Sequence, residues 1–162
     1  MEYIWPGIIV GQAIHAAAKL RIPDLLACGP KTIAELASEC GAHPLSLERL
    51  LRALSTLEMF APTGDGRFRN TQLTEVLRSD HPQSLRGAAI AFGSGFLWRA
   101  FGELSATITT GQPAFNHVFG TSFFEGSSPN RVEVFRVSRL LMLHSPGSGG
   151  HPTVRYWGRF WG

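Results

Sequence analysis

The chain has 162 residues, of which 44% are hydrophobic and 17% charged, so it is long enough for one domain with a real core and lacks the composition of a disordered chain. No apolar run reaches the roughly 18 residues that span a bilayer, so no membrane partner is expected, and the absence of a basic leader argues against a secretory signal. The net charge of +3 is unevenly distributed along the chain. Residues 1–125 carry 10 basic and 11 acidic side chains, whereas residues 126–162 carry five arginines and one glutamate.

The charge balance and the cysteines argue against two kinds of site. Phosphate contacts supply most of the affinity for nucleic acids, so the near-neutral charge of residues 1–125 argues against a nucleic-acid partner. The two cysteines, Cys28 and Cys40, are too few for a disulfide framework or a structural zinc site. The six histidines show no pair at helical spacing around a carboxylate, so we expect no metal. These features predict a reduced, cytoplasmic protein.

A first helix is predicted over residues 6–19, with Pro6 in the first turn, where its missing N–H is harmless. Almost all of its residues are apolar or small. A helix that is apolar all round is buried on most sides. Because this chain is small, we expect a second copy of the chain to cover part of the helix. A short helical turn follows at residues 22–26.

Residues 32–78 predict a winged-helix arrangement of helix, turn, helix, hairpin and helix. Thr32 and Glu35 fit a capping box, and Gly41 ends that helix. The next helix carries one apolar stripe at three- and four-residue spacing, which consists of Leu47, Leu50, Leu51, Leu54 and Leu57. The turn signal at 64–66 predicts a β-hairpin between residues 59–63 and 67–70. A short helix is expected over residues 71–78.

The segment from residue 84 to residue 125 is predicted to be helical and aromatic. Ser84 is expected to cap a helix that turns Leu85, Ala88, Ala89 and Phe92 inward, and Gly93-Ser94-Gly95 should break or kink it. A wide apolar stripe then runs from Phe96 to Ile108. The predicted fold class is mainly α, a winged-helix-like helical domain with one small β-hairpin and an N-terminal dimerisation helix.

The predicted domains are residues 1–125, the dimerisation and winged-helix-like domain, and residues 126–162, an atypical tail. In that tail Gly, Pro, Ser, Arg and Trp dominate without a period. This composition is typical of a disordered segment or of GC-rich DNA translated out of frame, and we interpret the tail as one of the two.

Residues 8–125 resemble the S-adenosylmethionine-dependent small-molecule O-methyltransferases of secondary metabolism. The resemblance rests on the order and spacing of several motifs, which are AAAKLRIPDLL at 16–26, TIAELA at 32–37, LERLLRAL at 47–54, Trp98 with Leu104, TGQPAF at 110–115, FG at 119–120 and FFE at 123–125. It implies a homodimer in which these regions intertwine two subunits and help to wall the acceptor pocket.

The resemblance also implies what this chain should not do alone. In the family the cofactor lies in a following doubly wound α/β domain, and the general-base histidine lies further on. Neither is expected in residues 1–162, so we predict a truncated chain with no catalytic residue, no cofactor-binding residue and no cofactor of its own. S-adenosylmethionine would serve the full-length family, with a small aromatic molecule as acceptor substrate.

Six residues are candidates for acceptor-pocket or dimer contacts: Trp98, Phe101, Phe115, His117, Phe119 and Phe123. For the aromatic members the alternative is plain core packing, and for His117 it is a position in a loop or on the surface. The apolar faces that normally meet the cofactor domain should leave exposed patches. We therefore expect poor solubility or weak self-association beyond the dimer.

Two other functions compete with this interpretation. A winged-helix transcription regulator would use Arg49 and Arg52 on its second helix and Arg67 and Arg69 on the wing, but the neutral charge and the long aromatic segment argue against it. A complete minimal enzyme would need a phosphate-binding loop and a catalytic constellation, which the sequence lacks.

Overall fold

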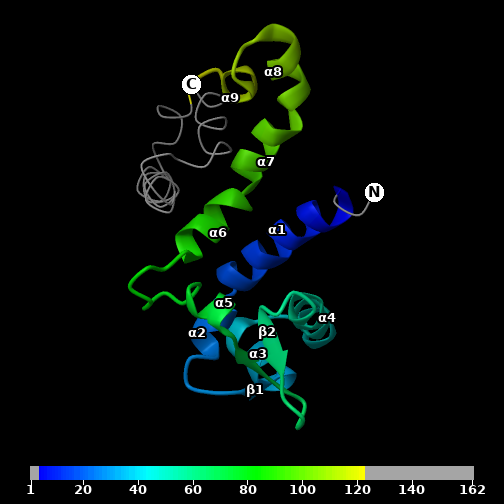
Figure 1. The fold of residues 1–162 in the computed structure, drawn as a ribbon, viewed down its shortest axis with the longest axis vertical. Coiled ribbons are helices and arrows are strands. Elements are labelled where there is room, and N and C mark those ends of the chain that lie inside the picture. Colours follow the sequence, from blue (N-terminus) through cyan, green and yellow to red (C-terminus); the bar gives the residue numbers. More distant parts are fainter. Residues whose placement is uncertain (1–3, 123–162) are drawn as a thin grey trace. The chain divides into compact units, whose positions relative to one another are not determined.

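The computed structural model describes residues 4–122, and the side chains from residue 7 onward (Figure 1). The chain divides between Gly93 and Ser94 into two compact units. The predicted domain boundary between residues 125 and 126 lies outside the described residues, as does the tail, and it stays a prediction. No described helix is long and apolar enough to cross a membrane.

The first unit contains six helices among its described residues and a small sheet. The helices are α1 (Ile4–Lys19), α2 (Ile22–Leu25), α3 (Ile33–Cys40), α4 (Pro44–Ser55), α5 (Gln72–Glu75) and α6 (Arg86–Phe92). The strands are β1 (Lys31–Thr32), β2 (Phe60–Pro62) and β3 (Arg67–Asn70). This order confirms the mainly helical, winged-helix-like fold and the predicted hairpin.

The sheet is larger than the predicted hairpin because a third strand joins it. Its order is β1-β3-β2 and both pairings are antiparallel, with Thr32 opposite Arg67 and Phe60 opposite Asn70. Thr32 takes part in the strand and also caps α3, because its extended backbone (φ −72°, ψ 162°) suits both roles. The predicted capping box is present, with the Thr32 hydroxyl accepting from the Glu35 amide at 3.2 Å.

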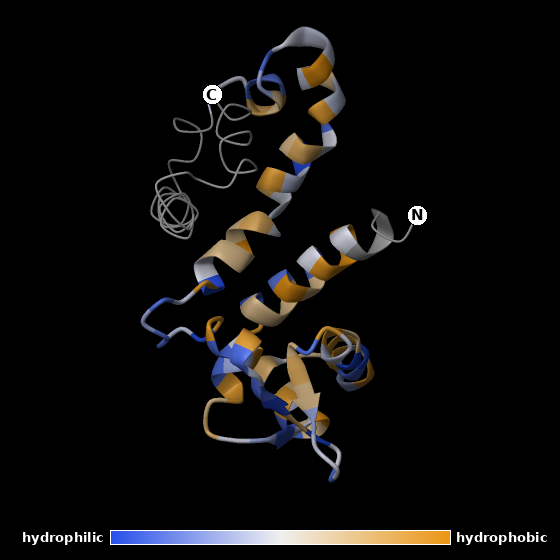
Figure 2. Ribbon diagram, in the orientation of Figure 1, coloured by the Kyte–Doolittle hydropathy of each residue, from blue (hydrophilic) through white to orange (hydrophobic). Residues whose placement is uncertain are grey.

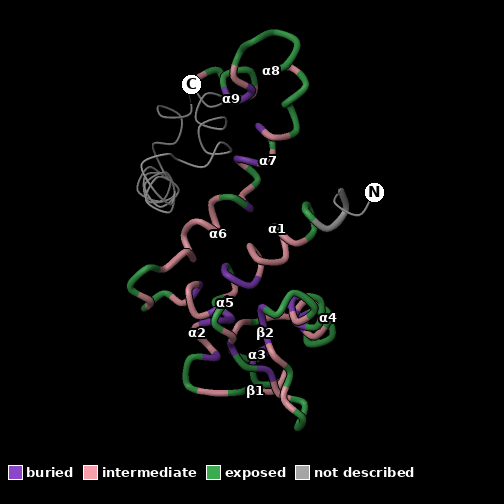
Figure 3. The backbone as a smooth tube through the Cα atoms, viewed as in Figure 1, coloured by how far each residue is buried: buried purple, intermediate pink, exposed green. Residues whose placement is uncertain are grey.

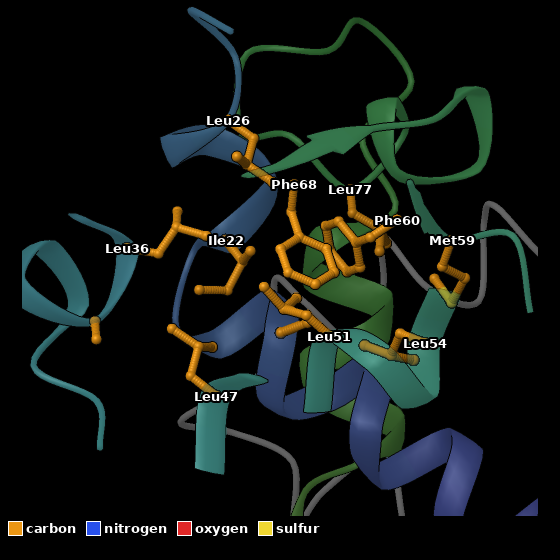
Figure 4. Close-up of a cluster of buried hydrophobic side chains, with 12 residues drawn as sticks. Ile22, Leu26, Leu36, Leu47, Leu51, Leu54, Met59, Phe60, Phe68 and Leu77 are labelled. Carbon is orange, nitrogen blue, oxygen red and sulfur yellow. The ribbon is translucent and has the colours of Figure 1, made fainter. Parts of the chain in front are cut away.

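The core of the first unit lies between the helices and the sheet (Figure 4). Ile22, Leu36, Leu51, Leu54 and Phe60 are at most 1% exposed there. Three residues of the predicted leucine stripe are buried in this core, namely Leu47, Leu51 and Leu54. Leu57 was expected to belong to it but is 42% exposed, because α4 ends at Ser55 and a turn follows in which Glu58 has a φ of 58°.

The second unit begins with α7 (Gly95–Gly102), α8 (Leu104–Thr110) and α9 (Ala114–Phe119). Its predicted apolar stripe is divided between α7 and α8 at Glu103. Leu97 and Ala100 of α7 and Ala114 and Phe115 of α9 are buried, and these two helices pack together. Ile108 of α8 is 69% exposed, so the stripe is buried only in part.

Candidate functional site

Helices α1 and α6 lie side by side in the first unit and form an apolar pair (Figures 1 and 2). At its C-terminal end α1 is buried, with Ala17 and Ala18 fully covered, whereas Ile8 and Ile9 nearer its start are 53% and 55% exposed. Helix α6 has no buried residue, as its colouring in Figure 3 shows. Contiguous apolar patches mark interaction sites, so the two adjacent exposed isoleucines of α1 are candidate interface residues.

The prediction that Phe92 points inward is wrong, because its side chain is 41% exposed at the end of α6. Leu85 and Ala89 do pack against the core cluster, as expected. Of the α6 side chains, Ala89 packs against the core cluster, whereas Phe92 at the end of the helix stays exposed. Phe92 therefore belongs with Ile8 and Ile9 to the exposed apolar side chains of this helix pair.

Polar side chains join α1 and α6 at both ends. Arg86 Nε donates to the Ala18 carbonyl at 3.0 Å. At the other end Gln12 Nε2 donates to the Gly93 carbonyl at 3.0 Å. The His15 Nδ1 and the Ile90 carbonyl are also 3.0 Å apart, and since a carbonyl only accepts, Nδ1 carries the proton. The two helices are thus antiparallel, and side chains of each helix bind backbone carbonyls of the other.

In the second unit three phenylalanine rings pack against one another. The Phe115 ring centroid lies 4.9 Å from that of Phe96 and 4.6 Å from that of Phe119, and the Phe96–Phe119 distance is 4.8 Å. The Arg99 guanidinium lies over the Phe119 ring, 5.1 Å from its centroid. These separations are those of favourable aromatic and cation–π contacts.

The structure brings together only part of the predicted aromatic set. Phe115 and Phe119 share the cluster, and Trp98 and Phe101 are half-buried on α7. His117 is exposed on α9, and Phe123 lies outside the described residues. The candidate set omitted Phe96, although the apolar stripe included it. Its spacing of 19 residues from Phe115 gives no local signal that the two rings meet.

A sequence profile for the O-methyltransferase dimerisation domain matches residues 3–80. Residues 3–80 are an O-methyltransferase dimerisation domain. A phenazine O-methyltransferase from Lysobacter antibioticus is 42% identical over 118 residues, which are 73% of this chain and 34% of that protein. The chain therefore spans about a third of the length of this curated relative.

Two solved structures resemble the dimerisation domain and the helices that follow it. A mitomycin 7-O-methyltransferase superposes with a TM-score of 0.75 and 35% identity, covering 88% of this chain and 43% of the other. An O-methyltransferase of neocarzinostatin biosynthesis was solved with S-adenosylmethionine and 2-hydroxy-5-methyl naphthoic acid. It superposes with a TM-score of 0.64 and 39% identity, covering 83% of this chain and 42% of that enzyme.

Two of the four arginines that a DNA-binding winged helix would use, Arg52 and Arg67, form ion pairs within the dimerisation domain. Arg52 forms an ion pair with Glu48 at 2.7 Å, and Arg67 forms ion pairs with Glu35 and Asp65, each at 3.2 Å. These acidic partners reduce the positive potential that would attract phosphates. Within the described residues, no three His, Cys, Asp or Glu side chains are arranged to hold a metal.

The Asp24 carboxylate of the dimerisation domain accepts three hydrogen bonds. Its Oδ1 accepts from the Ser79 backbone N–H at 2.6 Å, and Oδ2 accepts from the Ser79 hydroxyl at 3.0 Å and from Arg21 Nε at 3.2 Å. Burial opposes ionisation, but the bonds from Ser79 and Arg21 outweigh it, so the pKa of Asp24 lies below its usual value. The ionised carboxylate ties α2 to the segment after α5.

Proposed function

We propose that this chain is the dimerisation and acceptor-pocket region of an S-adenosylmethionine-dependent O-methyltransferase, inactive by itself, and that it forms a homodimer through α1 and α6. The dimerisation domain over residues 3–80 supports the family assignment. The exposed apolar side chains of Ile8, Ile9 and Phe92 carry the choice of surface. Burying one such side chain contributes about 1.5–3 kcal/mol before the costs of association.

Sedimentation velocity tests the homodimer. We expect the unmodified chain to sediment as a dimer at about 10 μM, a concentration at which a standard-sized interface is populated, and the Ile9→Glu variant to sediment as a monomer. The matched control is Leu73→Glu, because Leu73 is 54% exposed on α5 and should leave the dimer intact. A monomeric unmodified chain, or a dimeric Ile9→Glu variant, would contradict the proposed surface.

We further propose that the second unit contributes to the wall of a pocket for a small aromatic acceptor. The aromatic rings of Trp98, Phe101 and Phe119 keep exposed area that a flat ligand can contact. Phe115 is 0% exposed, so its role is to hold the cluster in shape. His117 is exposed and remains a candidate contact, as does Phe123. The aromatic acid bound by the neocarzinostatin relative supports this class of ligand.

Ligand-observed NMR tests the acceptor role, because saturation transfer detects weak binding. A hydroxynaphthoic acid should give a saturation-transfer signal with the unmodified chain and a weaker one with Trp98→Ala. The control Leu45→Ala changes an exposed residue of α4 in the other unit. Equal signals from Trp98→Ala and the unmodified chain would argue against a pocket wall at Trp98.

The cofactor does not fit the described residues. Cofactors that contain a nucleoside lie, in doubly wound α/β domains, at the carboxyl ends of parallel strands, beside a Gly-rich turn that opens a helix. The described strands β1, β2 and β3 are short and pair only antiparallel. We propose that residues 1–162 bind no S-adenosylmethionine and that another part of the full-length enzyme holds it. Equilibrium dialysis with the labelled cofactor tests this proposal, and micromolar binding would contradict it.

A further inference from the structure

Two side chains of α1 bind the backbone at the end of α6. Gln12 and His15, one turn apart on α1, bond the carbonyls of Gly93 and Ile90. Gly93 is buried although its neighbour Phe92 is exposed. A Cβ added to Gly93 would overlap the Cβ, Cγ and Nδ1 atoms of His15, so only glycine allows this close approach.

The second unit starts directly after this contact. Ser94 is the N-cap residue of α7, and its carbonyl accepts from the Trp98 amide at 3.1 Å. Only Ser94 therefore lies between Gly93, whose carbonyl accepts from Gln12, and the first residue of α7, the helix that carries Trp98 and Phe101. Whatever stabilises α1 against α6 also restrains the point at which α7 begins.

We propose that Gln12 and His15 are positioning residues for the Gly93–Ser94 joint, and that a second copy covering Ile8 and Ile9 on the same helix strengthens their hold. This inference rests on the proposed homodimer. It assigns to dimerisation a second consequence, which is a smaller population of the locally opened state at the end of α6. Because linkage is reciprocal, the joint and the dimer then stabilise each other.

Limited proteolysis with chymotrypsin tests the joint, because the enzyme cleaves after Phe92 only when the end of α6 opens locally. When opening is fast, the cleavage rate reports the open population. We expect the Gln12→Ala/His15→Ala variant to be cleaved there about thirtyfold faster, the change expected for two hydrogen bonds of ordinary net strength. The single variant His15→Asn should be cleaved as slowly as the unmodified chain, because the asparagine amide presents a donor close to the position of the His15 Nδ1. Lys19→Ala, an exposed change on α1, is the control.

The Ile9→Glu variant separates this inference from the proposed function. Sedimentation first establishes whether it is a monomer. A monomeric Ile9→Glu chain that is also cleaved several-fold faster at Phe92 supports the coupling, since this substitution leaves the bonding side chains of Gln12 and His15 unchanged. A monomer cleaved at the rate of the unmodified chain overturns the coupling and leaves the dimer surface standing. A Gln12→Ala/His15→Ala variant cleaved like Lys19→Ala overturns the positioning role. An unmodified chain that never dimerises overturns the homodimer and the coupling.

Discussion

The Arg86 side chain caps α1 from the first residue of α6: its Nε donates to the carbonyl of Ala18, 3.0 Å away, in the last turn of α1. Ala18 is fully buried. The carbonyls of a last helical turn lack partners within the helix, and a cation there also meets the negative end of the helix dipole. The same guanidinium lies 3.9 Å from the carboxylate of Asp24.

Replacing Arg86 should therefore destabilise the first unit. We expect Arg86→Met, which keeps an apolar stem but removes the donor, to lower the free energy of unfolding by about 1–3 kcal/mol. Urea unfolding followed by circular dichroism measures it. Arg49→Met, at an exposed position of α4, is the matched control. An equal effect of the two variants would mean that the bond to Ala18 contributes nothing.

Asp24 should make the stability of the first unit depend on pH. Its folded-state pKa lies below the ordinary value of 3.8, so ionised Asp24 stabilises the fold above that value. The contribution is lost as the pH falls from there through the folded-state pKa. We expect Asp24→Asn to lose about 1–3 kcal/mol of unfolding free energy at pH 7 and to differ less from the unmodified chain at pH 2.5.

Urea unfolding at the two pH values measures this difference. Glu103→Gln provides a control at an exposed carboxylate. A stability loss for Asp24→Asn that is the same at both pH values would show that the bonds from Ser79 and Arg21 do not depend on the charge.

The capping box of α3 makes a local prediction. The Thr32 hydroxyl accepts from the Glu35 amide, and the Glu35 carboxylate accepts from the Thr32 amide at 2.7 Å. Thr32→Ala should cost about 1 kcal/mol of unfolding free energy, whereas Ser38→Ala, on the exposed side of the same helix, should cost almost nothing. Thermal unfolding of the two variants compares them, and matching midpoints would contradict the role of the cap.

The phenylalanine cluster should determine the stability of the second unit. Phe115 is fully buried against Phe96 and Phe119, so Phe115→Ala should cost roughly 3–5 kcal/mol. Amide hydrogen exchange over residues 95–119 should accelerate, while exchange over residues 33–55 stays unchanged. His117→Ala, an exposed change on the same helix, should leave both regions as they are. Uniform acceleration across the two units would show that they unfold together.

The sequence alone determined the features that depend on near neighbours. The capping box joins residues three positions apart, and the buried face of α4 follows from the spacing of Leu47, Leu51 and Leu54. The turn at 64–66 similarly predicted the pairing of β2 with β3. Each of these signals arises within one or two turns of chain, where backbone geometry leaves few arrangements.

Tertiary structure alone decided the features that join distant parts of the chain. The bonds from Gln12 and His15 to the end of α6 span 81 and 75 residues, and the pairing of Thr32 with Arg67 adds a strand that no local pattern indicated. Phe92 is exposed although Ala89 of the same helix packs against the core. Periodicity shows that a helix has an apolar face, but which residues that face meets depends on the shape and packing of a surface supplied by another segment.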